Sequence, residues 1–166
     1  MSDGDYGVMD TLAGLADDSA LAELRRQRPD VVKHLQGSDK VIFSPQDDGG
    51  LPRAERAAAA LRVATLLRDP VLSEHYRARL APLDPEGTLA RSVEGGARIT
   101  EVRWDAILAH VDLVTRGPGS AERKDIDNLL AAGLSSHAVV SLSQLIAYVN
   151  FQSRVLAGLR MLKGAA

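Results

Sequence analysis

The sequence contains no cysteine among its 166 residues. This absence excludes disulfide bonds, thiolate metal sites, cysteine nucleophiles and the CxxC motif of dithiol redox enzymes. The chain also lacks an excess of basic residues, because 20 Lys and Arg against 22 Asp and Glu give a formal charge of -2. Non-specific nucleic-acid binding depends on basic charge, so we expect no nucleic-acid partner.

Motifs of several enzyme classes are missing as well. The sequence has no HExxH and no Glu-x-x-His pair, so we expect no bound metal. It contains no GxSxG elbow of the hydrolase type. Residues 117–120 resemble a phosphate-binding loop only in their glycines, because the Lys of that motif is absent.

No segment fits a signal peptide or a membrane helix. Residues 1–10 are acidic and lack the basic flank and apolar run of a signal peptide. The longest apolar stretch, residues 139–162, carries Gln144, Asn150 and Arg154, which are costly in a bilayer core. We therefore expect a cytoplasmic protein with no membrane contact.

Apolar residues recur with helical spacing along nearly the whole chain, and no run of alternating β-branched residues competes with them. The spacing predicts helices over residues 20–28, 29–43, 52–68, 70–81, 99–115, 121–132 and 136–162, with loops over 45–50 and 82–96. The chain is close to the roughly 150 residues of an average domain. We therefore expect one all-α domain over residues 1–166.

Polar residues and glycine mark where these helices begin and end. The expected N-caps, whose side-chain oxygen accepts a hydrogen bond from the first turn, are Ser19, Asp69, Ser120 and Ser135. Gly133 stands where a helix is expected to stop in a left-handed conformation.

The last expected helix has two apolar stripes. One contains Leu142, Leu145, Ile146, Val149 and Leu156, and the other, about 120° around the helix, contains Tyr148, Phe151, Val155 and Leu162. A helix that is apolar on two sides must be covered twice. We expect one stripe to pack on the chain's own core and the other on a neighbouring subunit. The alternative is that both stripes lie in the core of one chain.

Charged residues open the alanine-rich helix. Arg56 falls on the edge of the apolar stripe of that helix, whereas Glu55 lies away from it. If this end of the helix is covered, Arg56 requires a carboxylate or carbonyl partners, because an unpaired buried charge is expensive. The alternative is a first-turn Glu55 that is favoured by the helix dipole, beside a solvated Arg56.

The following helix carries an apolar arc formed by Val71, Leu72, His75, Tyr76 and Leu80. A desolvated imidazole near a carboxylate can act as a general acid or base near neutral pH. The alternative for His75 is a core histidine with a single hydrogen bond. We expect Arg77 and Arg79 to lie in solvent and His110 to pack between helices.

Two stretches resemble a known family. Residues 55–76, which run from Glu55-Arg56-Ala57 to Glu74-His75-Tyr76, resemble the core motif of the carboxymuconolactone decarboxylase and alkylhydroperoxidase D superfamily. Residues 104–135 and 144–154 resemble the later helices of its peroxidase-related members. The resemblance implies an alkylhydroperoxidase D-like helical fold that assembles into dimers, trimers or hexamers. Residues 51–166 would form its core, with residues 1–50 as an N-terminal helical extension.

The peroxidase branch of this family uses a Glu, a CxxC pair and a His. By resemblance, Glu55 matches the Glu, whereas Asp69 and Leu72 occupy the two cysteine positions. Tyr76 occupies the position of the His, with His75 beside it. Neither Asp nor Leu can form a sulfenate or a disulfide, so disulfide-cycling peroxidase chemistry is excluded.

The decarboxylase branch lacks the CxxC and carries a His followed by x-Arg, which the segment His75-Tyr76-Arg77 resembles with an offset of one residue. The resemblance implies lyase-like acid/base chemistry on a small carboxylate or lactone, without a cofactor. His75 would be the acid or base and Glu55 its catalytic partner. Tyr76, Arg77 and Arg56 would bind the substrate, the arginines through its carboxylate.

Two hypotheses follow. An enzyme requires Glu55 and His75 to meet within hydrogen-bond reach beside a pocket. The alternative is a non-catalytic protein that binds a small molecule or assembles with a thiol-bearing paralogue. The missing cysteines and the second apolar stripe of the last helix motivate this alternative.

Overall fold

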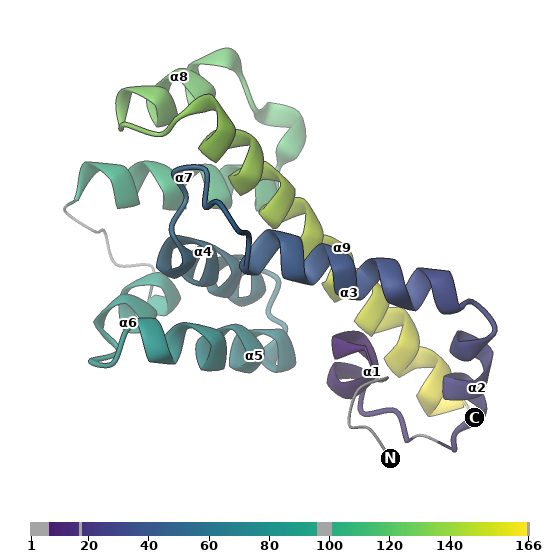
Figure 1. The fold of residues 1–166 in the computed structure, drawn as a ribbon. Helices are drawn as coiled ribbons and strands as arrows, with labels where there is room; N and C mark the ends of the chain where they lie inside the picture. Colours follow the sequence, from purple (N-terminus) through teal and green to yellow (C-terminus); the bar gives the residue numbers. More distant parts are fainter. Residues whose placement is uncertain (1–6, 17, 96–100, 166) are drawn as a thin grey trace.

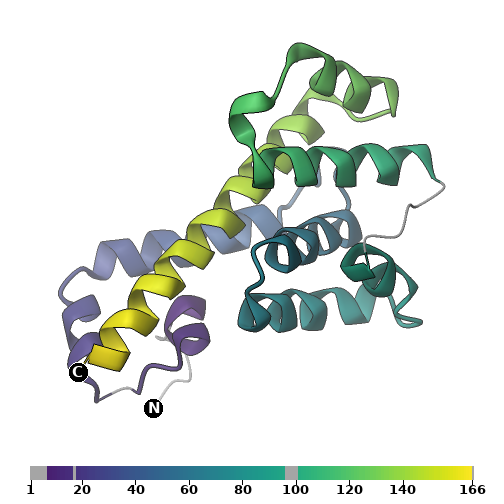
Figure 2. The same ribbon diagram turned by 180° about the vertical axis from the view of Figure 1, so that it is seen from behind.

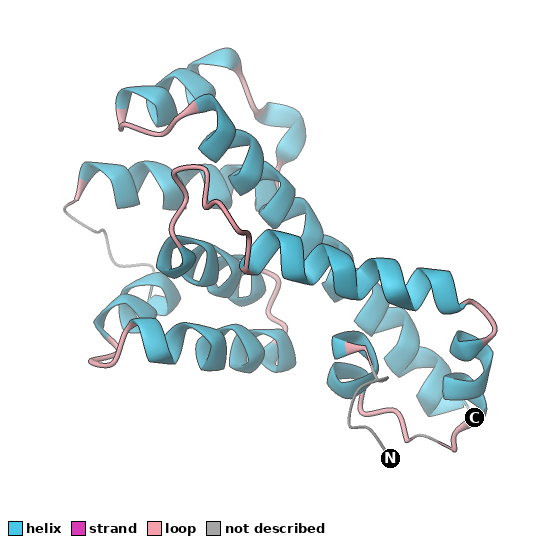
Figure 3. Ribbon diagram, in the orientation of Figure 1, coloured by secondary structure: helices cyan, strands magenta, loops and turns pink. Residues whose placement is uncertain are grey.

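The computed structural model describes residues 7–16, 18–95 and 101–165, and it contains helices and no strand in those ranges (Figures 1 and 3). The α-helices are α1 (Val8–Ala13), α2 (Ala20–Arg26), α3 (Pro29–Phe43), α4 (Arg53–Leu66), α5 (Pro70–Leu80), α6 (Thr88–Gly95), α7 (Val102–Arg116), α8 (Arg123–Ala131) and α9 (Ser136–Ala165). Two short 3-10 turns are η1 (Ala81–Leu83) and η2 (Pro118–Ser120). The prediction of an all-α fold is confirmed.

Helix α4 forms the centre of the fold, where it contacts α5, α6, α7 and α9. Its residues 57–60 are all alanine, and all are buried. Such small side chains let helices approach on several sides, because close packing leaves no room for larger ones. Seen from both sides, α9 runs from the α7 and α8 end of the molecule to α1 and α2, with α3 beside it (Figures 1 and 2). Within the described part of the chain, no helix combines the length and hydropathy that crossing a bilayer requires.

Most predicted helix ends are confirmed. Ser19 Oγ accepts from Ala22 N, and Ser135 Oγ accepts from Ala138 N. Asp69 Oδ1 accepts from the amides of the first turn of α5. Gly133 has a φ of +86°, which favours glycine. These signals are local, so the sequence predicts them well.

The predicted loop over residues 82–96 is wrong, because α6 occupies its second half. Asp84, in the loop before this helix, binds its first turn, since Oδ2 accepts from Ala90 N at 2.8 Å and Oδ1 accepts from the Thr88 hydroxyl. Val93 is fully buried, and α6 packs against α4. Capping and core packing therefore outweigh the glycines that indicated a loop.

The predicted N-cap at Ser120 is also wrong. Ser120 ends η2, and its hydroxyl donates to Gly117 O. Helix α8 begins three residues later with a capping box, in which Asp125 Oδ2 accepts from Glu122 N at 2.8 Å. Helix α1 was not predicted, and the expected helix start at residue 99 lies outside the described residues.

The two stripes of α9 differ in burial. The stripe that contains Leu142 and Ile146 is fully buried in the core. In the other stripe, Tyr148 packs near Phe43 of α3, but Phe151 is 42% exposed and Leu162 is 55% exposed. The core of a single chain therefore does not cover the whole second stripe.

Candidate functional site

Glu55 lies in the first turn of α4, and both of its carboxylate oxygens bind Arg103 of α7. Arg103 Nε donates to Oε1 at 2.7 Å and Nη2 donates to Oε2 at 2.9 Å. The same guanidinium donates to Gly50 O and Gly133 O. Bidentate pairs of this kind are strong and geometrically specific, and the Glu55 hydrogen bond raises the pKa of Arg103. Glu55 thus holds the arginine that connects α4, α7 and two turns.

Arg56 is only 4% exposed and donates to three main-chain carbonyls. These are Ile42 O, Asp48 O and Leu51 O, each at 2.8 Å. The prediction that a covered Arg56 requires carbonyl partners is confirmed, and the alternative of a solvated Arg56 is wrong. Burial lowers its pKa, whereas the charges of Asp48 and Glu55 oppose that change. Because each nitrogen already donates to the main chain, the structure gives Arg56 a role in joining α3 and the loop before α4.

The residues at the two cysteine positions of the resemblance are structural. Asp69 is buried, caps α5 and accepts from Arg160 of α9, with Nη1 to Oδ2 at 3.1 Å and Nη2 to Oδ1 at 3.3 Å. Leu72 is fully buried in the core. Both side chains therefore hold α5 in place.

Tyr76 lies in the core with its hydroxyl hydrogen-bonded to Gln152 Oε1 of α9. Its ring centroid is 5.3 Å from that of Phe43. Burial, aided by the charge of Asp39, raises the pKa of Tyr76 well above its usual value, so the phenol stays a neutral donor. Gln152 is also fully buried, and its Nε2 has no hydrogen-bond partner.

His75 is partly buried beside Tyr76, and its Nε2 is buried without a hydrogen-bond partner. Burial and the charge of Arg79 lower its pKa, whereas Asp39 opposes them, so the imidazole is neutral near pH 7. No hydrogen bond joins His75 to Glu55, whose oxygens are both taken by Arg103. The structure therefore does not form the Glu55–His75 pair that the enzyme hypothesis requires.

Sequence reasoning missed the carboxylate that faces this histidine. Arg79 Nη2 donates to Asp39 Oδ2 of α3 at 2.8 Å, and the guanidinium lies 4.2 Å from the Phe43 ring centroid. The expectation of a solvated Arg79 is wrong. Asp39 Oδ1 and Arg79 Nη1 are buried without a partner. We refer to Asp39, His75, Tyr76, Arg79 and Gln152 as the α3–α5–α9 polar cluster.

Arg77 lies outside this cluster, at the surface between α5 and α6. It pairs with Glu74 of its own helix, and its Nε donates to Glu94 Oε1 at 3.1 Å. The hydrogen bond with Glu94 raises the pKa of Arg77. Of the five predicted site residues, His75 and Tyr76 lie in this cluster, Glu55 and Arg56 lie at the start of α4, and Arg77 lies apart from both pairs.

Three larger cavities lie elsewhere. One of about 520 Å³ lies between α1, α2 and α3, one of about 710 Å³ is an open groove between α3 and α9, and one of about 470 Å³ lies between α7 and α8. None of the three is lined by Glu55, Arg56, His75, Tyr76 or Arg77. In the described ranges, no three His, Asp or Glu side chains form a group that could hold a metal ion.

Comparison with known proteins supports the fold. No family model matches the chain, and no curated protein matches it by sequence. Among solved structures, the chain is similar to the crystal structure of an uncharacterized peroxidase-related protein from Silicibacter sp. TM1040, with a TM-score of 0.70 and 15% identity. The match covers 76% of this chain and 66% of that one. At this identity the likeness shows the fold alone, and that fold is consistent with the expected alkylhydroperoxidase-like architecture.

Proposed function

We propose that this chain is a cysteine-free relative of the alkylhydroperoxidase-like proteins that acts by binding and assembly instead of thiol turnover. The supporting observation is that the residues at the two cysteine positions of the resemblance, Asp69 and Leu72, have structural roles. Asp69 caps α5 and pairs with Arg160, while Leu72 fills the core. Glu55 is likewise held by Arg103, so the residues that would serve a peroxidase instead connect helices.

Assembly through α3 and α9 is part of this proposal. The groove of about 710 Å³ between these helices is lined by apolar and small residues that include Val41, Ala147 and Phe151. Val41 is 69% exposed and Phe151 is 42% exposed. Exposed apolar surface of this kind is typical of interaction sites, and the groove continues the half-covered second stripe of α9.

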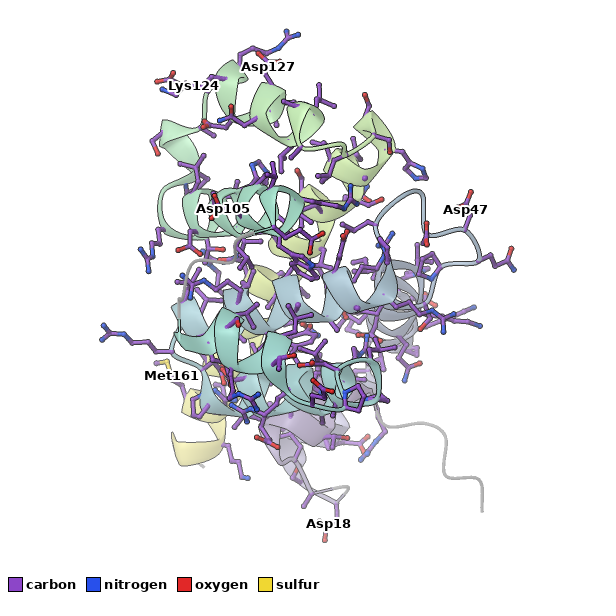
Figure 4. All side chains as sticks on the ribbon, turned by 90° about the vertical axis from the view of Figure 1, so that its left-hand side faces the viewer. Asp18, Asp47, Asp105, Lys124, Asp127 and Met161 are labelled. Atoms are coloured by element: carbon purple, nitrogen blue, oxygen red, sulfur yellow. The ribbon has the colours of Figure 1, made fainter. Side chains whose placement is uncertain are left out.

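Two measurements test the proposal. The purified chain should not consume organic hydroperoxides in repeated turnovers with a dithiol reductant, and it should sediment as an oligomer at micromolar concentration. Phe151→Glu should shift the sedimentation coefficient to that of a monomer, because a charge in an apolar interface is poorly paired. Met161→Glu is the matched control on the same helix, since Met161 is exposed outside the groove (Figure 4). Sustained peroxide turnover, or a monomeric unmodified chain, would contradict the proposal.

A second function has one observation in its favour. His75 is neutral through burial, its Nε2 lacks a partner, and Asp39 acts on it from α3. Such an imidazole could serve as the base in decarboxylation of a small carboxylate or lactone. Turnover of a lactone acid that His75→Gln abolishes and Arg77→Gln preserves would favour this enzyme over the binding protein.

A further inference from the structure

The groove between α3 and α9 differs in charge from the two other large cavities. Among the described residues that line it, none is Asp, Glu, Lys or Arg, whereas charged side chains line both of the others. Two copies of a chain that meet around a two-fold axis present the same surface to each other, and like charges that face each other are costly. Of these three cavities, the groove is therefore the one that a second copy of this chain can enter without charge repulsion from its lining.

The same groove combines projecting side chains with a hollow. Val41 is 69% exposed and Phe151 is 42% exposed. Gly37 of α3 and Ala147 of α9 line the groove with the smallest side chains. Beyond its neighbours and the backbone of its own helix, no atom lies within 4 Å of the place that a Cβ of residue 37 would take. A surface with both features can fit a copy of itself, because the projecting side chain of each copy fills the hollow of the other.

Gly37 has no role that the single chain explains. It lies inside α3 and is not among the glycines with a positive φ, so the backbone conformation does not require glycine. No neighbouring side chain requires the missing Cβ either. Glycine inside a helix is destabilising relative to alanine. A second helix that approaches α3 closely on this side would account for the small residue.

A stripe of exposed apolar and small residues continues the groove along α9. Its members recur with helical spacing on one side of the helix: Val140, Ala147, Phe151, Gly158 and Leu162. The stripe is about 33 Å long at 1.5 Å per residue. Arg154 lies on the same side, but its Nη1 donates to Asn150 O at 2.9 Å and to Asn150 Oδ1 at 3.3 Å. The stripe thus offers a long surface for a second α9.

We propose that a second copy of this chain docks in the α3–α9 groove around a two-fold axis. Phe151 of each copy enters the hollow above Gly37 and Ala147 of the other. This inference rests on the proposed function, because it names the partner and the symmetry of the assembly proposed there. A two-fold contact of this kind closes as a dimer, whereas a head-to-tail contact sets the groove against a different surface and builds a ring or a filament.

A single introduced cysteine tests the symmetry. Because the chain has no cysteine, Ala147→Cys provides one thiol at an exposed position. A two-fold axis through the groove places position 147 of one copy near position 147 of the other, so a short bis-maleimide should link the copies into covalent dimers on a denaturing gel. Ala157→Cys is the matched control, since Ala157 is exposed on α9 outside the groove, and its thiol should stay unlinked. Absence of dimers from Ala147→Cys, or equal yields from both variants, would overturn the proposal.

A larger side chain in the hollow tests the contact itself. Gly37→Leu should raise the dissociation constant of the dimer in sedimentation at least about tenfold, because overpacking a fitted contact is costly. Its melting temperature at a concentration where the chain is monomeric should not fall, because leucine favours the helix and meets open space. Ala157→Leu places the same side chain outside the groove and should leave the dissociation constant unchanged. An unchanged dissociation constant in Gly37→Leu would also overturn the proposal.

The outcomes distinguish this inference from the proposed function. An oligomer in which Ala147→Cys does not link would overturn the two-fold contact and leave the proposed assembly standing. A monomeric unmodified chain would contradict both.

Discussion

Asp69 at the start of α5 and His110 in α7 are both buried polar side chains, but in the described part of the chain only Asp69 has hydrogen-bond partners. Asp69 accepts from the amides of its own helix and from Arg160. His110 has no partner at either nitrogen. A satisfied polar group stabilises the folded chain, whereas an unsatisfied buried one destabilises it. The contrast separates a polar residue that supports the fold from one that lowers its stability.

Arginine provides most of the satisfied contacts, and it joins elements that are distant in sequence. Arg103 holds Glu55, and Arg56 holds the end of α3 and the loop that follows. Arg62 binds Asp112 through Nε and Nη2, both at 2.7 Å, while its Nη1 donates to Val93 O. The planar guanidinium suits this role, because its fixed donors can bind several acceptors at once. Helix α4 is therefore fixed on three sides by polar contacts as well as by its alanines.

Among the buried polar residues that have partners, we expect replacement of Arg56 to lower the free energy of unfolding most. Arg56→Met keeps the apolar stem but removes the side-chain donor from three main-chain carbonyls, of which Asp48 O alone still accepts from Leu51 N. We expect the free energy of unfolding to fall by about 3 to 5 kcal/mol, as measured by urea denaturation. Arg77→Met is the control, since Arg77 makes exposed ion pairs that contribute at most about 1 kcal/mol. If Arg56→Met and Arg77→Met lost the same unfolding free energy, the carbonyl contacts of buried Arg56 would contribute no more than the ion pairs of Arg77.

Cysteines introduced at positions 69 and 72, which correspond to the cysteine pair of the resemblance, should have the next largest effect. Asp69→Cys removes a helix cap and the Arg160 pair, and Leu72→Cys removes core volume, so together they should lower the unfolding free energy by about 2 to 3 kcal/mol. The helix N-terminus and Arg160 should hold the pKa of the thiol from Asp69→Cys below its usual range. The pH dependence of the rate at which this thiol is alkylated measures its pKa. The thiol from Leu72→Cys should react more slowly, because Leu72 is fully buried, whereas Asp69 is 6% exposed and pairs with Arg160. Equal reactivity at the two positions would show that α5 does not hold them as described.

Removal of the Tyr76 hydroxyl tests whether the buried link to α9 is satisfied. Tyr76→Phe leaves Gln152 Oε1 without its donor, so we expect a loss of about 1 to 2 kcal/mol in urea denaturation. The double variant with Gln152→Leu should recover part of this loss, because it removes both polar groups. A single variant as stable as the unmodified chain would mean that the hydrogen bond contributes nothing.

Local sequence signals predicted most helices and their caps, whereas α6 depends on contacts with residues that are distant in sequence. Ser19, Asp69 and Ser135 cap helices as expected because a cap depends only on the next few residues. Helix α6 was missed because Val93 contributes through α4, which lies far away in sequence. The glycines nearby also obscured its first turn, which Asp84 caps from the preceding loop.

The candidate site was less predictable for the same reason. The position of Arg56 on an apolar stripe indicated that it requires carbonyl partners, and this prediction is confirmed. The partner of Glu55 could not be found, because Arg103 lies on another helix and no periodicity connects the two. Gln152 offered a signal that could have been used, because its spacing places this polar residue on the apolar stripe of Val149 and Leu156, which is fully buried.

Replacement of His110 should change the free energy of unfolding least, and it should raise this free energy instead of lowering it. Burial lowers the pKa of His110 below its ordinary value of 6.5, so the native chain binds fewer protons there than the unfolded chain does. His110 therefore destabilises the folded chain further as the pH falls below about 6.5. His110→Phe removes two unpaired nitrogens at nearly constant shape, so it should raise the unfolding free energy by about 1 kcal/mol at pH 7.5 and by more at pH 5. Urea denaturation at both pH values measures the difference. A variant that is less stable at pH 7.5 would show that the imidazole has a partner within the folded chain, and the contrast with Asp69 would no longer hold.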